Sequence, residues 1–334
     1  MRSCVLSPGC GYPCRLSTST PPVSTDLLTP QMALILEFIN RAKKPGFHTM
    51  TPAAARTTYL YAAEVLEPKR APLERVEELS FAADDGTPLP ARLYAPSREK
   101  LPVMLYLHGG GFTIGGLETH DSLCRQFALR SGAAVIALDY RLAPEHRFPT
   151  AIDDCWAVLR ALPAAGERLG LDTSRLAVGG DSAGGTLAAV CALMARDAGL
   201  KLALQVLITP GTIAHADSPS HLRFAHGYLL DRDTILWMFD QYIDEADRED
   251  WRFAPMLADD HEGVAPALVV IAECDPLVDE GLAYADKLRA AGVEVSLEFA
   301  RGVTHDFIKL ARMLPEGRAA QQAVADALKA ALFG

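Results

Sequence analysis

The chain has no apolar run long enough to cross a bilayer. Its longest runs, such as Val103–Leu107 and Ala267–Ala272, have the length of strands, whereas a membrane helix needs roughly 18 residues or more. The chain also lacks an excess of basic residues, since its 334 residues carry a formal net charge of -10. Nucleic-acid-binding proteins concentrate positive charge instead. We therefore expect a soluble, cytoplasmic protein with no membrane span and no nucleic-acid partner.

Metal-binding patterns are also missing. There is no H-E-x-x-H zinc motif, and Cys4, Cys10 and Cys14 have no nearby histidine and form no C-x-x-C pair. The cysteines inside apolar segments, which we expect to be reduced core thiols, are Cys124, Cys155, Cys191 and Cys274. Residues 1–25, rich in Ser, Thr and Pro, lack the continuous apolar region of a signal peptide. We interpret them as a disordered leader or as an upstream extension of the reading frame.

After residue 70, short apolar runs alternate with helical stretches. A turn at Asp84-Asp85-Gly86 predicts a hairpin between two strands at 76–82 and 89–95. Further strands are expected at 103–107, 133–138, 175–179, 204–209, 267–272 and 293–299. Helices are expected at 119–131, 149–162, 183–196, 280–291 and 315–332. Because helices separate apolar runs that do not alternate, we predict an α/β fold with a mostly parallel sheet flanked by helices.

One long segment interrupts this alternation. Between Thr209 and Ala267 the sequence predicts one helix, at 231–242, and little strand. An insertion after a strand's carboxyl end lies on the side where α/β sheets carry their sites. We expect the insertion, about 211–252, and two helices within 26–70 (29–41 and 51–66) to form a lid over the site. The remainder of 71–334 would be the catalytic domain.

The most informative motif is Gly180-Asp181-Ser182-Ala183-Gly184. It lies where the strand at 175–179 gives way to a helix that begins at Ala183. A serine between glycines at such a junction is typical of a nucleophile elbow, a turn so sharp that the serine adopts strained backbone angles. Its hydroxyl is then presented beside the free N–H groups of a helix start. We therefore predict that Ser182 is a nucleophile.

A second glycine-rich motif, His108-Gly109-Gly110-Gly111-Phe112, follows the strand at 103–107. Consecutive glycines let the backbone pass close to a ligand and turn N–H groups toward it. A tetrahedral oxyanion needs such donors. His108 is expected to orient its own loop by hydrogen bonding and not to act as a base.

An acid and a base follow the elbow in the order of a hydrolase triad. Asp275 comes directly after the strand at 267–272, although Glu273 and Asp279 are alternatives for the acid within the same turn. We favour Asp275 because Pro276 stiffens its turn and because Asp279 can cap the following helix. His305 follows the final strand, so the order is Ser…Asp…His, as in α/β-hydrolases. We predict that His305 is the general base.

Five stretches together resemble the hormone-sensitive-lipase-like carboxylesterases, in their bacterial branch with a G-D-S-A-G elbow. They are H-G-G-G-F at 108–112, D-Y-R-L-A-P-E-H at 139–146, G-D-S-A-G-G at 180–185, D-P-L-V-D-E at 275–280 and G-V-T-H-D-F at 302–307. The resemblance implies an α/β-hydrolase fold with an α-helical cap and a Ser182–Asp275–His305 triad. It also implies an oxyanion hole from the N–H groups of Gly110, Gly111 and Ala183. Substrates would be short- and medium-chain acyl esters, with no cofactor.

The acyl pocket is expected to draw side chains from the cap. The candidates are Phe112, Leu222, Phe224, Leu229 and Trp237. A small capped pocket favours acyl chains of about two to eight carbons, since each further buried CH₂ adds only about 0.8 kcal/mol. The resemblance further suggests a homodimer formed through the last strand and helix.

Two alternatives to an esterase remain open. The triad does not distinguish esters from amides, so an amidase or peptidase is one alternative. A small-molecule receptor is the other, because plant gibberellin receptors resemble this family and have lost catalysis. Those receptors lack the histidine that this chain retains as His305, and the intact triad therefore favours an enzyme.

Overall fold

The computed structural model describes residues 26–42 and 44–334, so the predicted leader at 1–25 lies outside the described residues. The strands are β1 Arg75–Ala82, β2 Pro88–Ala95, β3 Leu101–Leu107, β4 Ala134–Leu138, β5 Leu171–Asp181, β6 Leu204–Ile208, β7 Ala267–Cys274 and β8 Val295–Thr304. The α-helices are α1 Pro30–Arg41, α2 Pro52–Leu66, α3 Leu117–Ser131, α4 Thr150–Leu169, α5 Ala183–Asp197, α6 Pro219–Arg223, α7 Arg232–Tyr242, α8 Val278–Ala290 and α9 Pro315–Phe333. Short 3₁₀ turns are η1 Phe47–Thr49, η2 Glu245–Asp247, η3 Pro255–Leu257 and η4 Phe307–Leu310.

Within the described residues the strands form a single sheet in the order β1-β2-β4-β3-β5-β6-β7-β8. The pairs β1–β2 and β2–β4 are antiparallel, and every other neighbouring pair is parallel. The predicted hairpin is therefore present, with Gly86 in the left-handed region at φ 83°. The prediction of a mostly parallel α/β sheet is confirmed. All carboxyl ends of the parallel strands meet at one edge, where α/β folds place their sites.

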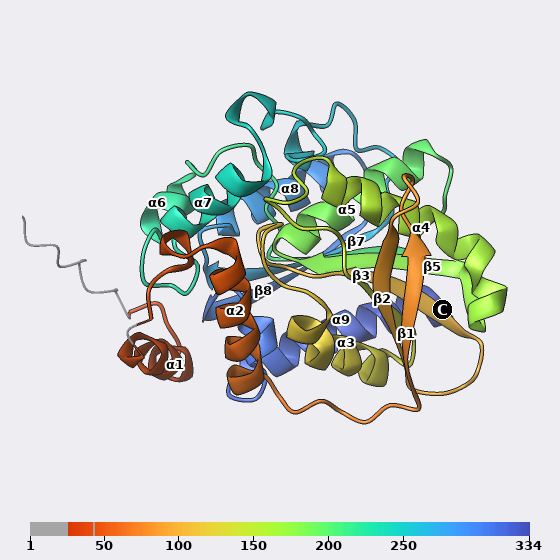
Figure 1. Cartoon of the computed structure of the whole chain (residues 1–334), viewed down its shortest axis with the longest axis horizontal. Coiled ribbons are helices and arrows are strands. Elements are labelled where there is room, and N and C mark those ends of the chain that lie inside the picture. The colour runs from red at the N-terminus through yellow and green to blue at the C-terminus, as the bar shows by residue number, and fades with distance from the viewer. Residues whose placement is uncertain (1–25, 43) are drawn as a thin grey trace, which may run out of the picture.

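Helices cover both faces of the sheet (Figure 1). On one face α3 and α9 pack together with α1, and on the other lie α4, α5 and α8. Burial on both faces of the sheet explains why the sequence of β3 does not alternate between apolar and polar residues. Leu105 contributes to the core on the α5 side and Tyr106 to the core on the α3 side, and both are fully buried. A central parallel strand needs apolar side chains on both faces.

Several element ends differ from the sequence-based prediction. Strands β7 and β8 continue beyond their predicted ends because they remain paired as far as Cys274 and Thr304. Helix α4 continues past Pro163, since its last turn buries Gly166 and Leu169 against the fold. Tertiary packing thus outweighs the tendency of proline to end a helix. The short helix α6 was not predicted.

The segment between β6 and β7 carries α6, α7, η2 and η3. It packs against the N-terminal helices: His48 Nδ1 lies 3.4 Å from Thr234 Oγ1, and Phe47 joins an apolar cluster with Trp237 and Met238. These two parts of the chain, distant in sequence, lie side by side at one end of the molecule (Figure 1).

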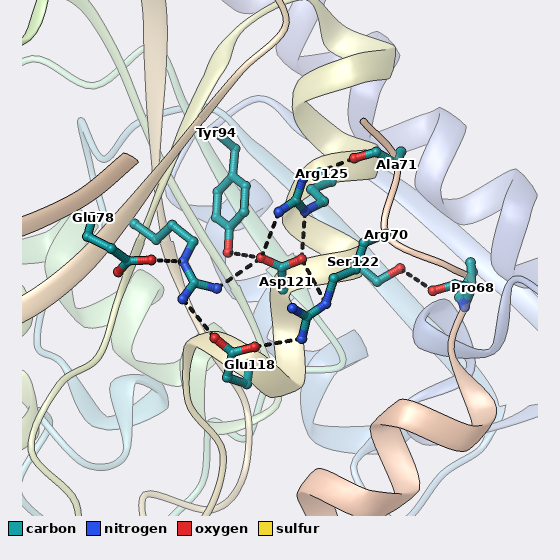
Figure 2. A network of polar contacts seen from close by, with 10 residues as sticks. Pro68, Arg70, Ala71, Glu78, Tyr94, Glu118, Asp121, Ser122 and Arg125 are labelled. Atoms are coloured by element: carbon teal, nitrogen blue, oxygen red, sulfur yellow. Dashed lines mark hydrogen bonds and ion pairs between the residues drawn. The ribbon is translucent and has the colours of Figure 1, made fainter. Parts of the chain in front are cut away.

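A buried acid anchors the link that follows α2. Asp121 on α3 is fully buried, accepts hydrogen bonds from Arg92, Arg125 and the Tyr94 hydroxyl, and forms an ion pair with Arg70 at 3.2 Å (Figure 2). Burial alone raises the pKa of Asp121, but the surrounding arginines and Tyr94 hold it below its usual value. This network connects both β2 and the segment that follows α2 to helix α3.

Among the described residues, no helix is both long and apolar enough to cross a membrane.

Candidate active site

Ser182 stands at the apex of a strained turn between β5 and α5. Its backbone has φ 53° and ψ −123°, a conformation that side-chain-bearing residues rarely adopt. A methyl group at Gly180 would clash with the Gly184 carbonyl, and one at Gly184 would clash with the Leu107 carbonyl. The glycines of the motif are therefore required by the close approach of β3, β5 and α5, and Ser182 remains partly exposed at the sheet edge.

The loop after β3 lies beside this turn. Gly110 and Gly111 have φ 124° and 57°, which only glycine adopts without cost. Among the described residues, the N–H groups of Gly110, Gly111 and Ala183 donate to no protein acceptor. Three unpaired donors at the start of α5 and in the adjoining loop can bind an anionic oxygen.

His305 and Asp275 form a buried pair. His305 Nδ1 lies 2.7 Å from Asp275 Oδ2, and the Leu277 N–H donates to Asp275 Oδ1 at 2.9 Å. Burial alone lowers the pKa of His305, but the Asp275 carboxylate outweighs it and raises that pKa above its usual 6.5. Protonated His305 is thus stabilised by its carboxylate.

The alternative acids make other contacts. Glu273 lies within β7 and accepts the Gly302 N–H at 2.7 Å, while Asp279 accepts the Ser220 N–H at 2.8 Å. Neither faces the histidine as Asp275 does. Within the described residues Ser182 Oγ makes no hydrogen bond to His305, a contact that hydrolases often tighten only when substrate binds.

Asp181, whose importance the sequence did not reveal, connects the elbow to the glycine loop. It accepts hydrogen bonds from the Gly109 N–H at 3.1 Å and the Tyr106 hydroxyl at 2.5 Å, and its Oδ2 lies 3.2 Å from His120 Nε2. Burial alone raises the pKa of Asp181, but His120 and further partners hold it well below its usual value. These partners come from distant parts of the chain, so no local pattern pointed to them.

His108 has the orienting role that was predicted for it. Its ring stacks on Tyr140 with centroids 4.3 Å apart, and its Nδ1 lies 2.8 Å from the Gly109 carbonyl oxygen. The Tyr140 hydroxyl donates to the His108 carbonyl at 2.7 Å. Burial lowers the pKa of His108 to about 3, so the ring is neutral and supports the loop.

An apolar pocket opens beside Ser182. The space inside it measures about 490 Å³ when the part open to solvent is included. The lining residues are Gly111, Phe112, Ser182, Ala183, Thr186, Gly211, Ile213, Leu230, Ile235, Met238, Phe239, Phe253, Leu277 and Glu280. Of the predicted pocket residues, the structure places Phe112 in this wall.

The other four predicted pocket residues lie elsewhere, and the prediction is corrected at these positions. Leu222 is 65% exposed, and Phe224 packs on Tyr228 beside a separate pocket. Leu229 packs against the core cluster shared by α1, α3 and α9, and Trp237 packs in the cluster around Ile114. For Trp237 the reason is helical geometry: on α7 the pocket face carries Ile235, Met238 and Phe239, and Trp237 lies on the opposite side of the helix.

Glu280 is an unexpected acid in the pocket wall. It is fully buried and accepts the N–H groups of Thr212 and Ile213, and its Oε1 lies 3.4 Å from His221 Nε2. Burial raises the pKa of Glu280 to about 8 and lowers that of His221. The pair joins the cap to α8.

The comparisons with known proteins agree with this geometry. A model of the alpha/beta hydrolase fold family matches residues 104–309. An ethyl acetate hydrolase of Pseudomonas putida is 41% identical over 90% of this chain and 98% of its own. A carboxylesterase of Mycobacterium tuberculosis is 42% identical over 79% of this chain and 85% of its own.

Solved structures give the same result. A thermostable esterase from Pseudomonas putida matches with a TM-score of 0.88 and 33% identity, over 92% of this chain and 98% of its own. A hyperthermophilic esterase from the archaeon Pyrobaculum calidifontis matches with a TM-score of 0.86 and 37% identity, over 91% of this chain and 98% of its own. The chain belongs to the hormone-sensitive-lipase-like carboxylesterases of the α/β-hydrolase superfamily.

Proposed function

We propose that this carboxylesterase hydrolyses short- and medium-chain acyl esters through an acyl-enzyme on Ser182. The observation that carries the proposal is the combination of a strained, partly exposed serine with a buried His305–Asp275 pair at 2.7 Å. All three residues follow carboxyl ends of parallel strands, namely β5, β8 and β7. The esterase names of the relatives support the same chemistry.

In the proposed reaction, Ser182 Oγ attacks the ester carbonyl carbon while His305 Nε2 takes its proton. The tetrahedral intermediate collapses, the acyl–alkoxide bond breaks, and His305 returns the proton to the leaving alcohol. Water then attacks the acyl-enzyme with His305 again as base, which releases the carboxylic acid and regenerates Ser182. Asp275 fixes the imidazole tautomer and stabilises its cation without taking the proton.

The developing oxyanion would be held by the N–H groups of Gly110, Gly111 and Ala183. These groups have no protein acceptor among the described residues, so they are free for a ligand oxygen. Loss of one such donor costs about 3–4 kcal/mol in the barrier.

The acyl chain would enter the apolar pocket beside Ser182. Phe112, Ile235, Met238 and Phe253 line it, and these bulky side chains limit how much of a long chain can be buried. We therefore propose a preference for acyl chains of about two to eight carbons, since each buried CH₂ contributes only about 0.8 kcal/mol.

The test is hydrolysis of p-nitrophenyl esters from acetate to palmitate by the purified protein, with Ser182→Ala measured alongside. The proposal expects kcat/KM to peak among the short chains and to fall to background in the variant. An unchanged rate in Ser182→Ala would end the serine mechanism, and a peak at palmitate would end the proposed chain length.

A further inference from the structure

A buried cation lies beneath the proposed active site, on the turn that follows His305. Lys309 belongs to η4 and is 4% exposed. Its Nζ donates to the Tyr59 hydroxyl at 2.8 Å, lies 3.1 Å from Glu67 Oε1 and sits 4.4 Å from the centre of the Tyr59 ring. A buried ammonium is stable only when such partners replace its water.

Both partners belong to one element, helix α2. Tyr59 lies within α2, and Glu67 is its C-terminal cap residue and is also buried. The Tyr59 hydroxyl also lies 3.4 Å from Asp306 Oδ2, next to His305 in the chain. The Lys309 contacts therefore join α2 directly to the loop that carries His305.

The same helix contacts the other catalytic loop. Arg56 on α2 donates to the Thr113 carbonyl at 2.9 Å and to the Ala143 carbonyl at 2.8 Å. Beyond its end, the Ser122 hydroxyl donates to the Pro68 carbonyl at 2.9 Å (Figure 2). Helix α2 thus bridges the glycine loop after β3 and the histidine loop after β8, and its far end is held by α3.

We propose that Lys309 is a positioning residue for ester hydrolysis, because its buried ammonium holds helix α2 against the loop of His305 and thereby fixes the imidazole relative to Ser182. This inference rests on the proposed role of His305 as general base. Lys309 does not touch substrate; it acts through Tyr59, Glu67 and the histidine loop.

The charges around Lys309 give the proposal a distinctive consequence. The groups that face Lys309 and its partner Glu67 are Tyr59, Asp306, Asp181 and His120. The groups that face His305 are Asp275, Asp306 and Asp181, all of which raise its pKa. Loss of the Lys309 charge removes a cation that faces Asp306 and Asp181, two acids that also act on His305, so the His305 pKa rises further.

The first experiment compares Lys309→Met with Arg312→Met. Arg312 is an exposed cation of the same segment that also reaches α2, with Nη1 3.5 Å from the Val65 carbonyl. Lys309→Met is expected to lower kcat roughly 10- to 100-fold, the effect of a small misplacement of a reacting group, with KM within about twofold. The acidic limb of its kcat/KM profile should move to higher pH. Arg312→Met should match the wild type in kcat, in KM and in the pH of the acidic limb.

A second variant separates positioning from folding. Removal of one partner of a buried ion pair is far more destabilising than removal of both, so Lys309→Met/Glu67→Gln should fold with a melting temperature near that of the wild type. The proposal expects this double variant to keep the low kcat. A folded double variant with wild-type kcat would overturn the inference, even if Ser182→Ala is inactive as the proposed function requires. Activity in Ser182→Ala would instead overturn the proposed function itself.

Discussion

The proposed general base, His305, must have a neutral imidazole to accept a proton, so we expect its pKa to set the pH range of activity. Asp275, at 2.7 Å, outweighs burial and raises this pKa above 6.5. We predict that kcat/KM falls as the pH drops through the raised pKa, with the acidic limb above pH 6.5. A pH profile with p-nitrophenyl butyrate measures this.

The same pair predicts the effect of removing the carboxylate. In Asp275→Asn the imidazole loses its anionic partner, so the acidic limb should move to lower pH and kcat should fall by roughly 10⁴-fold. An acidic limb at the same pH in the variant and the wild type would mean that Asp275 does not raise the pKa of His305. The raised pKa also affects stability: this contribution is fully present below pH 6.5 and is lost as the pH rises through the folded-state value.

The glycine loop allows a matched comparison of single methyl groups. Gly110 has φ 124°, and a methyl group there would strike the Ile114 carbonyl, whereas Gly86 has φ 83° with open space around it. We predict that Gly110→Ala lowers kcat roughly 10²- to 10³-fold, as the loss of an oxyanion donor does. Gly86→Ala carries similar backbone strain far from the loop and should keep wild-type kcat. An equal loss of kcat in both variants would point to general instability and contradict the proposed oxyanion role of Gly110.

Among the elements, helix α3 depends on Asp121 for its attachment. Asp121 is fully buried among three arginines (Figure 2). Asp121→Asn leaves these cations short of a partner, and we predict a loss of about 3–5 kcal/mol in the free energy of unfolding. Urea unfolding at pH 7 measures this, with Glu37→Gln as the control, because Glu37 forms an exposed pair with Arg41 that contributes little.

The pH dependence of this contribution has a definite sign. Because the folded-state pKa of Asp121 lies below its usual 3.8, its stabilisation is present above pH 3.8 and is lost as the pH falls through the folded-state value. The stability gap between wild type and Asp121→Asn should therefore narrow in acid. A gap that is constant down to low pH would contradict the ion-pair origin.

The sequence predicted those features that local patterns determine. The elbow around Ser182, the hairpin at Gly86 and the turn of Asp275 each depend on a few adjacent residues, and each has the predicted structure. The partners of Asp181 and Lys309 come together only in the folded chain, since they lie on strands and helices far apart in sequence. Burial of Lys309 and Asp121 was unpredictable for the same reason.

The pocket shows most clearly where sequence reasoning fails. Apolar residues of the cap are numerous, and which of them face the site depends on how α7 is rotated against the sheet. The rotation places Ile235 and Met238 in the pocket wall and leaves Trp237 out of it, packed in the cluster around Ile114. A periodic pattern predicts where a helix lies in the sequence, but tertiary contacts determine which side of that helix lines the pocket.

For the whole molecule, this arrangement predicts how the substrate range can be changed. Leu230 lines the pocket and is only partly buried, so Leu230→Ala should enlarge the pocket at modest cost in stability. We predict a shift of the chain-length optimum toward longer esters, by up to about fourfold in kcat/KM for each additional buried CH₂. Leu222→Ala, at a site 65% exposed, should leave the profile unchanged. An identical shift in both variants would contradict the pocket assignment.

The central claim is that one serine, Ser182, carries the acyl group during turnover. The most direct measurement is reaction with a p-nitrophenyl dialkyl phosphate, followed by intact mass and peptide mapping in parallel with residual esterase activity. The account predicts a single dialkylphosphoryl adduct on Ser182, loss of activity in proportion to labelling, and no adduct in Ser182→Ala. Stoichiometric labelling elsewhere with loss of activity, or full activity in a chain labelled at Ser182, would contradict it.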